Sequence, residues 1–385
     1  GYQCNMGLAL WTSNATLTNS GVTNSEDWGL TVVAGVVDII GGTFGGNETY
    51  GIFTQSASIN VDGTTFDGGR RVSVYMNQNS TGVIDNATFQ NAQYESDFEY
   101  TSGEDLIRSV SYYQGDDIQA YDSELIISNT TFQDGESGIT GYGFNGEASI
   151  TIQDSTFSRY NSDPIFSGTG SNFTIDRVTF DEIGQRALYC SSGTVSLDKV
   201  TISNTTKYKY RNETYRNGEL DRETTFESPG QAVYGYQCDY TFEDVAISGT
   251  DGQAMYVDSG SIEIDGLAIS NPYRDASGTS AVQLSWRNTG TELGYPSAYI
   301  NDMSLTGLGD VDGLRISSWV DEFGELATGT VSINELSVEG DQEATRGGDG
   351  IEVIDIGNLQ ITGLEIDDTK QVGLRLTRTN ATITG

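Results

Sequence analysis

The sequence predicts an all-β fold, a single parallel β-helix solenoid of about 14 coils spanning residues 1–385. A phrase of two short apolar segments around a kink at Asp or Asn recurs, and residues 149–157 and 172–180 show two copies offset by about 23 residues. Glycine is abundant (48) and proline scarce (4), and Val, Ile, Thr, Tyr and Phe fill the apolar positions. This composition favours short strands and tight turns over helices. The chain is read as one domain, or as a segment of a longer protein.

Each coil is expected to open with a small residue and an alternating apolar run. The clearest openings are Gly7–Leu10, Trp28–Val32, Tyr50–Phe53, Arg71–Val74, Gly138–Ile139, Pro164–Phe166, Ala187–Tyr189, Asp349–Val353 and Gly373–Leu376. The early coils close on Phe44, Phe66, Phe89, Phe132, Phe157 and Phe180, and the later ones on Ile247, Ile269, Leu305, Val338 and Ile366. Because side chains alternate between the faces of a strand, the closing residues are predicted to form an inward ladder.

Parallel strands joined by Gly, Asn and Asp kinks resemble the right-handed parallel β-helix superfamily, which includes pectate-lyase-like enzymes, tailspikes and surface adhesins. The likeness extends over nearly the whole chain, but it is a repeat pattern and not a catalytic signature. It implies a right-handed solenoid and leaves the function open.

The formal net charge of −36 argues against nucleic acid as a partner and against anionic membrane surfaces. No run of 18 apolar residues exists, so no transmembrane segment is expected. An acidic, solvated coat is typical of an extracellular or cell-surface protein, although it serves solubility alone equally well. The chain begins with Gly1 and not Met, which we interpret as a mature or excised segment.

Three cysteines are present. Alignment of the coils brings Cys190 close to Cys238, so these two are expected to form a disulfide, with free buried thiols as the alternative. Cys4 lies in the phrase Gly-Tyr-Gln-Cys, which is repeated at residues 235–238. By that analogy its partner would precede residue 1.

Insertions between coils are expected to form surface loops, which often carry function. They span residues 91–105, 203–230, 286–296 and 319–329. The longest interleaves basic and aromatic residues: Lys207, Tyr208, Lys209, Tyr210, Arg211, Tyr215, Arg216 and Arg222. We interpret it either as a solvated loop or as an interaction loop for an acidic protein or glycan. The acidic insertion 91–105 could meet it between subunits.

Nine Asn-x-Thr sequons occur: Asn14, Asn47, Asn79, Asn86, Asn129, Asn172, Asn204, Asn212 and Asn380. Asn86, Asn129 and Asn204 occupy the kink position, where Asn tolerates a left-handed conformation. For the others, N-linked glycosylation is the expectation.

Two motifs raise an enzymatic alternative. Residues 115–120, which include Asp116 and Asp117, resemble the paired-aspartate phrase of polygalacturonases, and residues 313–317 are similar to that family's basic motif. The resemblance implies a carboxylate pair for glycoside hydrolysis. The chain has no histidine, so that family's histidine motif is missing. For a lyase, Arg315 or Arg375 could be the basic residue.

No cofactor is expected, although Ca²⁺ is possible because aspartates are plentiful. The leading hypothesis is an extracellular glycosylated structural protein without catalytic residues: a segment of an adhesin, envelope layer or filament subunit. It would associate with itself, with other surface proteins or with glycans. The alternative is a carbohydrate-active enzyme, a polysaccharide hydrolase or lyase, with Asp116 and Asp117 as its candidate catalytic residues.

Overall fold

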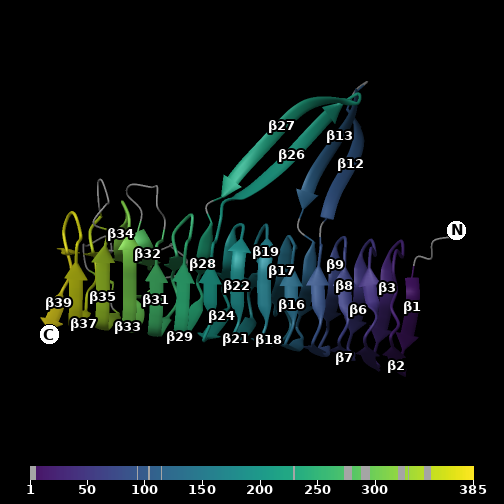
Figure 1. The fold of residues 1–385 in the computed structure, drawn as a ribbon, viewed down its shortest axis with the longest axis horizontal. Coiled ribbons are helices and arrows are strands. Elements are labelled where there is room, and N and C mark those ends of the chain that lie inside the picture. The colour runs from purple at the N-terminus through teal and green to yellow at the C-terminus, as the bar shows by residue number, and fades with distance from the viewer. Residues whose placement is uncertain are drawn as a thin grey trace. The chain divides into compact units, whose positions relative to one another are not determined.

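A computed structural model of the chain describes residues 6–92, 94–102, 105–113, 115–228, 230–272, 280–287, 295–319, 326–327, 329–341 and 348–385. The chain separates into two compact units. Unit 1 comprises residues 1–166, 183–185 and 207–228, and unit 2 comprises residues 167–182, 186–206 and 229–385. The fold class is confirmed: the strands form the long parallel sheets of a right-handed β-helix (Figure 1).

In unit 1 each coil contributes one strand to a parallel first sheet and one or two strands to a parallel second sheet. The first-sheet strands are β1 (Met6–Trp11), β3 (Trp28–Val33), β6 (Tyr50–Gln55), β9 (Val72–Asn77), β14 (Asp116–Tyr121) and β17 (Ser137–Tyr142). The second-sheet strands are β2 (Asn14–Thr18), β4 (Val36–Ile40), β5 (Thr43–Gly45), β7 (Ser58–Asp62), β8 (Thr65–Asp67), β10 (Thr81–Asp85), β11 (Thr88–Gln90), β15 (Glu124–Ser128), β16 (Thr131–Gln133), β18 (Ala148–Gln153) and β19 (Thr156–Tyr160).

Unit 2 repeats this plan. Its first-sheet strands are β23 (Arg186–Ser191), β28 (Gln231–Tyr236), β30 (Met255–Asp258), β32 (Ser280–Ser285), β34 (Asp312–Ser317), β36 (Ile351–Ile354) and β38 (Leu374–Thr377). Its second-sheet strands are β21 (Ser171–Asp176), β22 (Thr179–Ile183), β24 (Thr194–Asp198), β25 (Thr201–Ser203), β29 (Asp239–Ser248), β31 (Ile262–Ser270), β33 (Ser297–Leu308), β35 (Thr330–Gly340), β37 (Leu359–Asp367) and β39 (Ala381–Thr384). The strand β20 (Ile165–Ser167) lies where the chain passes from one unit to the other.

The interior of unit 1 contains the predicted aromatic ladder. Equivalent residues of successive coils are hydrogen-bonded in register, as in the pairing of Phe66 with Phe89. The rings of Phe44, Phe66, Phe89, Phe132 and Phe157 stack in sequence, with centroids 4.3–5.7 Å apart, and all five are buried. Aromatic pairs at such distances add to the stabilisation that burial alone provides.

In unit 2 the same inward position becomes aliphatic. Phe180 pairs with Ile202, and buried Ile247, Ile269, Leu305 and Val338 follow in register. This unit also contains the disulfide between Cys190 and Cys238, with an S–S distance of 2.08 Å. Cys4 lies outside the described residues.

Kinks between strands use residues with positive φ. Asn86, Asn129 and Asn204 have φ of 51°, 48° and 54°. Each side-chain amide donates to an aspartate of the preceding coil, as Asn129 Nδ2 does to Asp85 Oδ1 at 2.8 Å. Asn is therefore used at these kinks because it adopts the left-handed conformation and ties adjacent coils together.

Two insertions that were expected to be loops form hairpins in unit 1. They are β12 (Tyr94–Ser102) with β13 (Asp105–Tyr113), and β26 (Tyr208–Arg216) with β27 (Glu219–Ser228). Strands β13 and β26 pair antiparallel, so the acidic and basic insertions meet within one chain (Figure 1). Arg108 lies 5.9 Å from the centroid of the Tyr215 ring. The insertions 286–296 and 319–329 lie largely outside the described residues.

Candidate functional site

The side chains of Asp116 and Asp117, the predicted catalytic pair, point in different directions. Asp117 is 1% exposed and accepts a hydrogen bond from the hydroxyl of Tyr160, and its Oδ1 has no hydrogen-bond partner among the described residues. Asp116 is only partly buried and accepts a hydrogen bond from the amide of Gln119, a residue that points outward. Burial raises the pKa of Asp116 to about 6 and raises that of Asp117 well above its usual value. One carboxyl group therefore points outward and the other into the coil.

A row of polar side chains lies on the outer face of the first sheet of unit 2. Strands β32, β34, β36 and β38 place Gln283, Arg315, Glu352 and Arg375 at paired positions. Inward neighbours such as Leu314 and Ile351 are fully buried, so the row points away from the core. Paired positions of adjacent strands are about 4.8 Å apart, which is close enough for neighbouring side chains to interact.

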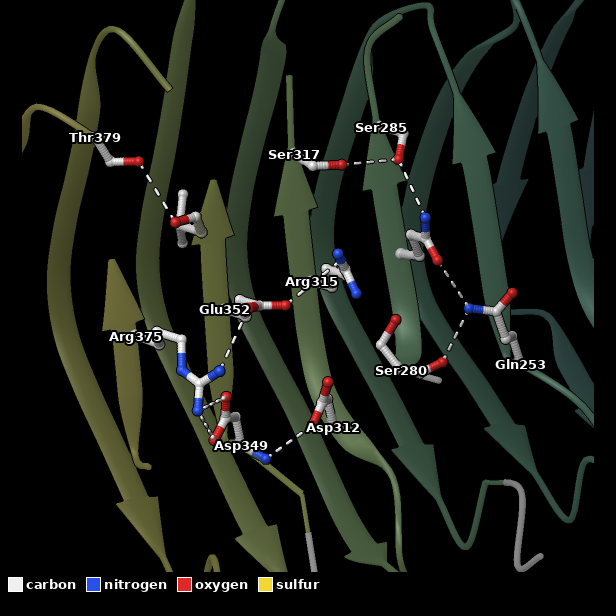
Figure 2. A network of polar contacts seen from close by, with 12 residues as sticks. Gln253, Ser280, Ser285, Asp312, Arg315, Ser317, Asp349, Glu352, Arg375 and Thr379 are labelled. Atoms are coloured by element: carbon white, nitrogen blue, oxygen red, sulfur yellow. Dashed lines mark hydrogen bonds and ion pairs between the residues drawn. The ribbon is translucent and has the colours of Figure 1, made fainter. Parts of the chain in front are cut away.

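Glu352 lies between two guanidinium groups (Figure 2). Its Oε2 is 3.5 Å from Arg315 Nε, and its Oε1 is 3.8 Å from Arg375 Nη1. Arg375 also contacts Asp349, with Nη2 3.0 Å from Oδ2. Asp349 is 4% exposed, whereas the side chain of Arg375 is 44% exposed. A buried carboxylate thus holds an accessible cation in a fixed orientation.

Backbone contacts fix Asp349. Its amide donates to Asp312 Oδ1 at 2.9 Å, and its own Oδ1 accepts from the amide of Val372 at 3.0 Å. The next residue is Gly350, where an added Cβ would lie 2.6 Å from the carbonyl oxygen of Gly373. The coils approach so closely here that only glycine fits.

Uncharged polar groups continue the row on its other side (Figure 2). Gln253 Nε2 donates to the carbonyl of Ser280 at 3.1 Å and lies 3.3 Å from Gln283 Oε1. The hydroxyls of Ser285 and Ser317 lie 3.0 Å apart. Hydroxyl and amide groups in this arrangement can donate hydrogen bonds to a hydroxylated ligand and accept hydrogen bonds from it.

Aromatic side chains occupy the same outer position in earlier coils of unit 2. Tyr189, Tyr234 and Tyr256 are paired in register, and Tyr256 pairs with Gln283. The guanidinium of Arg186 lies 4.1 Å from the centroid of the Tyr189 ring. Cation–π contacts of this kind orient an arginine without neutralising it.

A further arginine on this face rests on a buried aspartate. Arg287 Nε lies 3.0 Å from Asp258 Oδ2; the arginine is 60% exposed and the aspartate 6%. Burial raises the pKa of Asp258, and the nearby Arg287 opposes that shift. Arg378 and Asp355 form a third pair of this type, 2.6 Å apart. Unit 2 therefore presents several guanidinium groups in fixed positions.

The predicted glycosylation sites differ in accessibility. Asn14, Asn79, Asn86, Asn129, Asn204 and Asn380 are exposed, and Asn172 is partly buried. Asn47 is 2% exposed, and its Nδ2 donates to the carbonyl of Val22 at 3.2 Å. A glycan on Asn47 is incompatible with that contact. The side chain of Asn212 lies outside the described residues.

The structure describes only some of the side chains of the basic insertion 203–230. The side chains of Tyr208, Lys209, Tyr210 and Arg211 lie outside the described residues. Lys207 and Arg222 are exposed, Tyr215 donates to Glu213 Oε2 at 2.6 Å, and Arg216 lies 3.8 Å from Asp221. The described contact between a cation and a carboxylate in this insertion, Arg216 with Asp221, therefore lies within the hairpin.

Among the described residues, no group of three or more Cys, Asp or Glu side chains could hold a metal ion. Within the same part of the chain, no helix is long and apolar enough to cross a membrane.

Sequence analysis identified Arg315 and Arg375 in this row but not Glu352 or Asp349. The Asp-Gly phrases at 312–313 and 349–350 were a usable signal, since each precedes an outward residue of the row by three positions.

Comparisons with known proteins identify only the fold. No protein family matches the sequence, and no curated protein matches it. A solved PL6 alginate lyase in complex with a trisaccharide aligns with 95% of this chain and 83% of its own at 12% identity, with a TM-score of 0.50. The Azotobacter vinelandii mannuronan C-5 epimerase AlgE4 A-module aligns with 96% of this chain and all of its own at 11% identity, with a TM-score of 0.37. A GH87 α-1,3-glucanase catalytic domain bound to nigerose aligns with 96% of this chain and 63% of its own at 11% identity, with a TM-score of 0.32.

These matches correct the leading functional hypothesis. An adhesin, envelope layer or filament segment was expected, but the solved structure that shares this fold at a TM-score of 0.50 is an alginate lyase. The expectation was wrong because a regular solenoid with an acidic surface serves enzymes and structural proteins equally well.

Proposed function

We propose that the chain is a carbohydrate-active enzyme that binds and cleaves a uronate-containing polysaccharide on the outer face of the first sheet of unit 2. The observation that carries this proposal is the row Arg315–Glu352–Arg375, with one side chain from each of three successive coils. The PL6 alginate lyase supports the same class of substrate, because its fold matches along most of its length.

Charge distribution supports an acidic ligand at this row. The chain has 55 acidic and only 19 basic residues, so most of its surface repels anions. The outer face of the first sheet of unit 2 carries four described arginines that locally weaken this repulsion: Arg186, Arg287, Arg315 and Arg375. A guanidinium group matches a carboxylate in shape and can donate two parallel hydrogen bonds to it. In the free chain Glu352 forms ion pairs with Arg315 and Arg375, and a uronate carboxylate would compete for these two guanidinium groups.

Elimination is the reaction that best suits this arrangement. An arginine pair that neutralises the uronate carboxylate makes the hydrogen on the adjacent ring carbon, C5, more acidic. Once displaced from the guanidinium groups, the Glu352 carboxylate would accept that proton. The C–H electron pair then forms the C4–C5 double bond as the C4–O bond breaks. The leaving oxygen takes up a proton from solvent, and Glu352 then releases its proton to solvent. No water is consumed, and one product carries an unsaturated uronate.

Hydrolysis is the second candidate, because Asp349 and Glu352 both contact the guanidinium of Arg375. Two carboxyl groups near one bond are what glycoside hydrolysis requires. In that reaction a water molecule is consumed and both products are saturated, so the products distinguish the two reactions.

We further propose that the protein acts outside the cell on this glycan. The disulfide between Cys190 and Cys238 supports an oxidising compartment. Occupied sequons, self-association and a Ca²⁺ requirement remain proposals, which can be tested by intact mass before and after deglycosylation, by sedimentation and by adding a chelator.

The test is to incubate the purified chain with alginate, polygalacturonate and a neutral glucan. Ultraviolet absorbance reports the new double bond, and a reducing-end assay reports cleavage by either reaction. Glu352→Gln should lower kcat by about 100-fold or more, because a general base contributes about 10²–10⁴-fold. The control is Arg378→Ala, which breaks another arginine–carboxylate pair of unit 2, the pair with Asp355, outside the row.

Unsaturated products that depend on Glu352 support the proposal, and saturated ones that depend on Glu352 support hydrolysis. If the folded chain cleaves none of the polymers, or if Glu352→Gln behaves like Arg378→Ala, the proposal is overturned.

A further inference from the structure

We propose that unit 1 carries a second glycan-binding surface, which takes an uncharged polysaccharide on the aromatic cluster of Tyr121, Tyr142 and Phe144. This inference goes beyond the proposed cleavage reaction, because it concerns a different unit and a ligand of different charge. It starts from an outer face on which aromatic side chains follow one another from coil to coil.

The aromatic series begins in the first coils of unit 1. The ring of Phe53 lies 4.8 Å from Trp28 and 5.4 Å from Tyr75, with interplanar angles of 13° and 5°. Tyr75 lies 5.5 Å from Tyr121. These rings lie on the outer face of the first sheet and are only partly buried. Together they form a continuous apolar strip with access to solvent.

At the end of the strip three rings form a platform. The centroids of Tyr121, Tyr142 and Phe144 are 5.3–5.8 Å apart in every pairing, and the interplanar angles are 8–11°. Three parallel rings at nearly equal separations cannot be stacked in one column, so they must be offset from one another. The Phe144 residue is 66% exposed, which leaves much of its ring open to solvent.

The loop that carries Phe144 is held in place. Asp122 Oδ1 accepts hydrogen bonds from the amides of Phe144, Asn145 and Gly146 at 2.6, 3.0 and 3.0 Å. A carboxylate that accepts three backbone hydrogen bonds fixes the turn. Phe144 is therefore presented to solvent by an ordered loop. An exposed phenylalanine lowers solubility and does not stabilise the core, so its position favours a role in binding.

The groups around the platform are mostly uncharged. Gln119 pairs with Thr140 beside Tyr121, and Asn77 lies at the end of β9, next to the same position. Burial raises the pKa of Tyr121 to about 12, so its hydroxyl stays protonated at neutral pH. Asp122 lies at the platform, but its Oδ1 is engaged by the three backbone amides of the loop. Asp116 is a further acid on this face, and burial raises its pKa. Amides and phenol hydroxyls can donate and accept hydrogen bonds without attracting either sign of charge.

This chemistry fits a neutral saccharide better than other occupants. Sugar rings offer apolar C–H faces for aromatic stacking and hydroxyls for the surrounding amides. A uronate polymer would find no described cation on the platform itself. A second copy of this chain, at a net charge of −36, would be repelled.

The test is affinity electrophoresis of the full chain in gels that contain soluble β-glucan, xylan, galactomannan or polygalacturonate. The chain carries Glu352→Gln, so that no polymer is consumed. At least one neutral polymer should retard it relative to a gel without polymer. Phe144→Ala should weaken that retardation about ten-fold, which corresponds to one stacking contact of about 1.4 kcal/mol. Tyr142→Ala should have a similar effect.

The matched control is Tyr299→Ala, which removes a 44% exposed ring from β33, a second-sheet strand. Tyr299→Ala should bind like its parent. The inference is overturned if no neutral polymer retards the chain, if Phe144→Ala matches Tyr299→Ala, or if sedimentation shows that Phe144 instead mediates association between copies. Binding is measured without turnover, so it can succeed or fail independently of the cleavage reaction.

Discussion

The two units share one coil plan and use it differently. Unit 1 stacks phenylalanines inside and aromatic rings outside, whereas unit 2 packs aliphatic side chains inside and presents Arg315, Glu352 and Arg375 outside. Within each unit, backbone hydrogen bonds between coils in register stabilise the solenoid. This pairing requires only that the inward side chains are apolar. The outward positions are therefore free to differ, which lets one repeat build an aromatic face in unit 1 and in the first coils of unit 2, and a charged face in the later coils of unit 2.

Equivalent positions of two coils show how much the outward residues can differ. Asp116 and Gln119 of β14 are three residues apart, as are Asp312 and Arg315 of β34. The two sets occupy the same place in their coils, yet only the second brings a cation to Glu352. The following predictions test whether the contrast between the units is functional.

The largest effect is expected from removing the cations of unit 2. The double substitution of Arg315→Ala with Arg375→Ala should lower kcat/KM on a uronate polymer by about 10²–10⁴-fold, since hydrogen bonds to charged groups contribute about 1.5–3 kcal/mol each. Steady-state kinetics measures this. Gln119→Ala, at the equivalent coil position of unit 1, should stay close to the parent; an equal loss there would end the functional contrast between the faces.

Next in size is the aromatic ladder of unit 1. Phe89→Ala should lower the free energy of unfolding by about 3–5 kcal/mol, because it leaves a cavity between Phe66 and Phe132. Ile247→Val in unit 2 should cost about 0.5–1.5 kcal/mol. Urea unfolding followed by tryptophan fluorescence measures both. A loss below about 1 kcal/mol for Phe89→Ala would mean that the ladder adds little to stability.

The disulfide of unit 2 comes third. Replacing Cys190 and Cys238 by serine opens a loop with a sequence separation of 48. The unfolded chain then gains entropy, and the loss of stability should be about 2–4 kcal/mol. Thermal unfolding under oxidising and reducing conditions checks this. The parent should lose stability on reduction and the serine variant should not; identical responses would contradict the role assigned to the bond.

The smallest effect is the pH dependence from Asp116. Its pKa is about 6 in the folded chain and 3.8 when exposed, so between these values the folded state holds a proton that the unfolded state has released. The contribution of Asp116 to stability should therefore be fully present below about pH 4, fall as pH rises to about 6 and then level off. Asp116→Asn should remove about 1–2 kcal/mol of that decline, since the side chain is partly exposed. Unfolding midpoints at several pH values measure it, and an unchanged slope would exclude this role for Asp116.

The sequence predicted the repeat because each coil must satisfy the same local rule. Inward Phe, Ile and Val, outward polar residues and Asn or Asp at the kinks are all visible over a few residues. The approach of Cys190 to Cys238 follows from the coil period as well. Arg315 and Arg375 could be noticed one at a time, because they are rare cations in an acidic chain.

The local pattern of the sequence could not show which residues from distant coils come together. Arg315, Glu352 and Arg375 come together only because coils of unequal length, with insertions between them, return to one register. The pair Asp116 and Asp117 looked catalytic in sequence, yet Asp117 is buried against Tyr160 whereas Asp116 is only partly buried. The sequence alone determined the coil and its period, since both are set by local alternation. Only the tertiary structure decided which outward side chains share a face, since that depends on the register between coils.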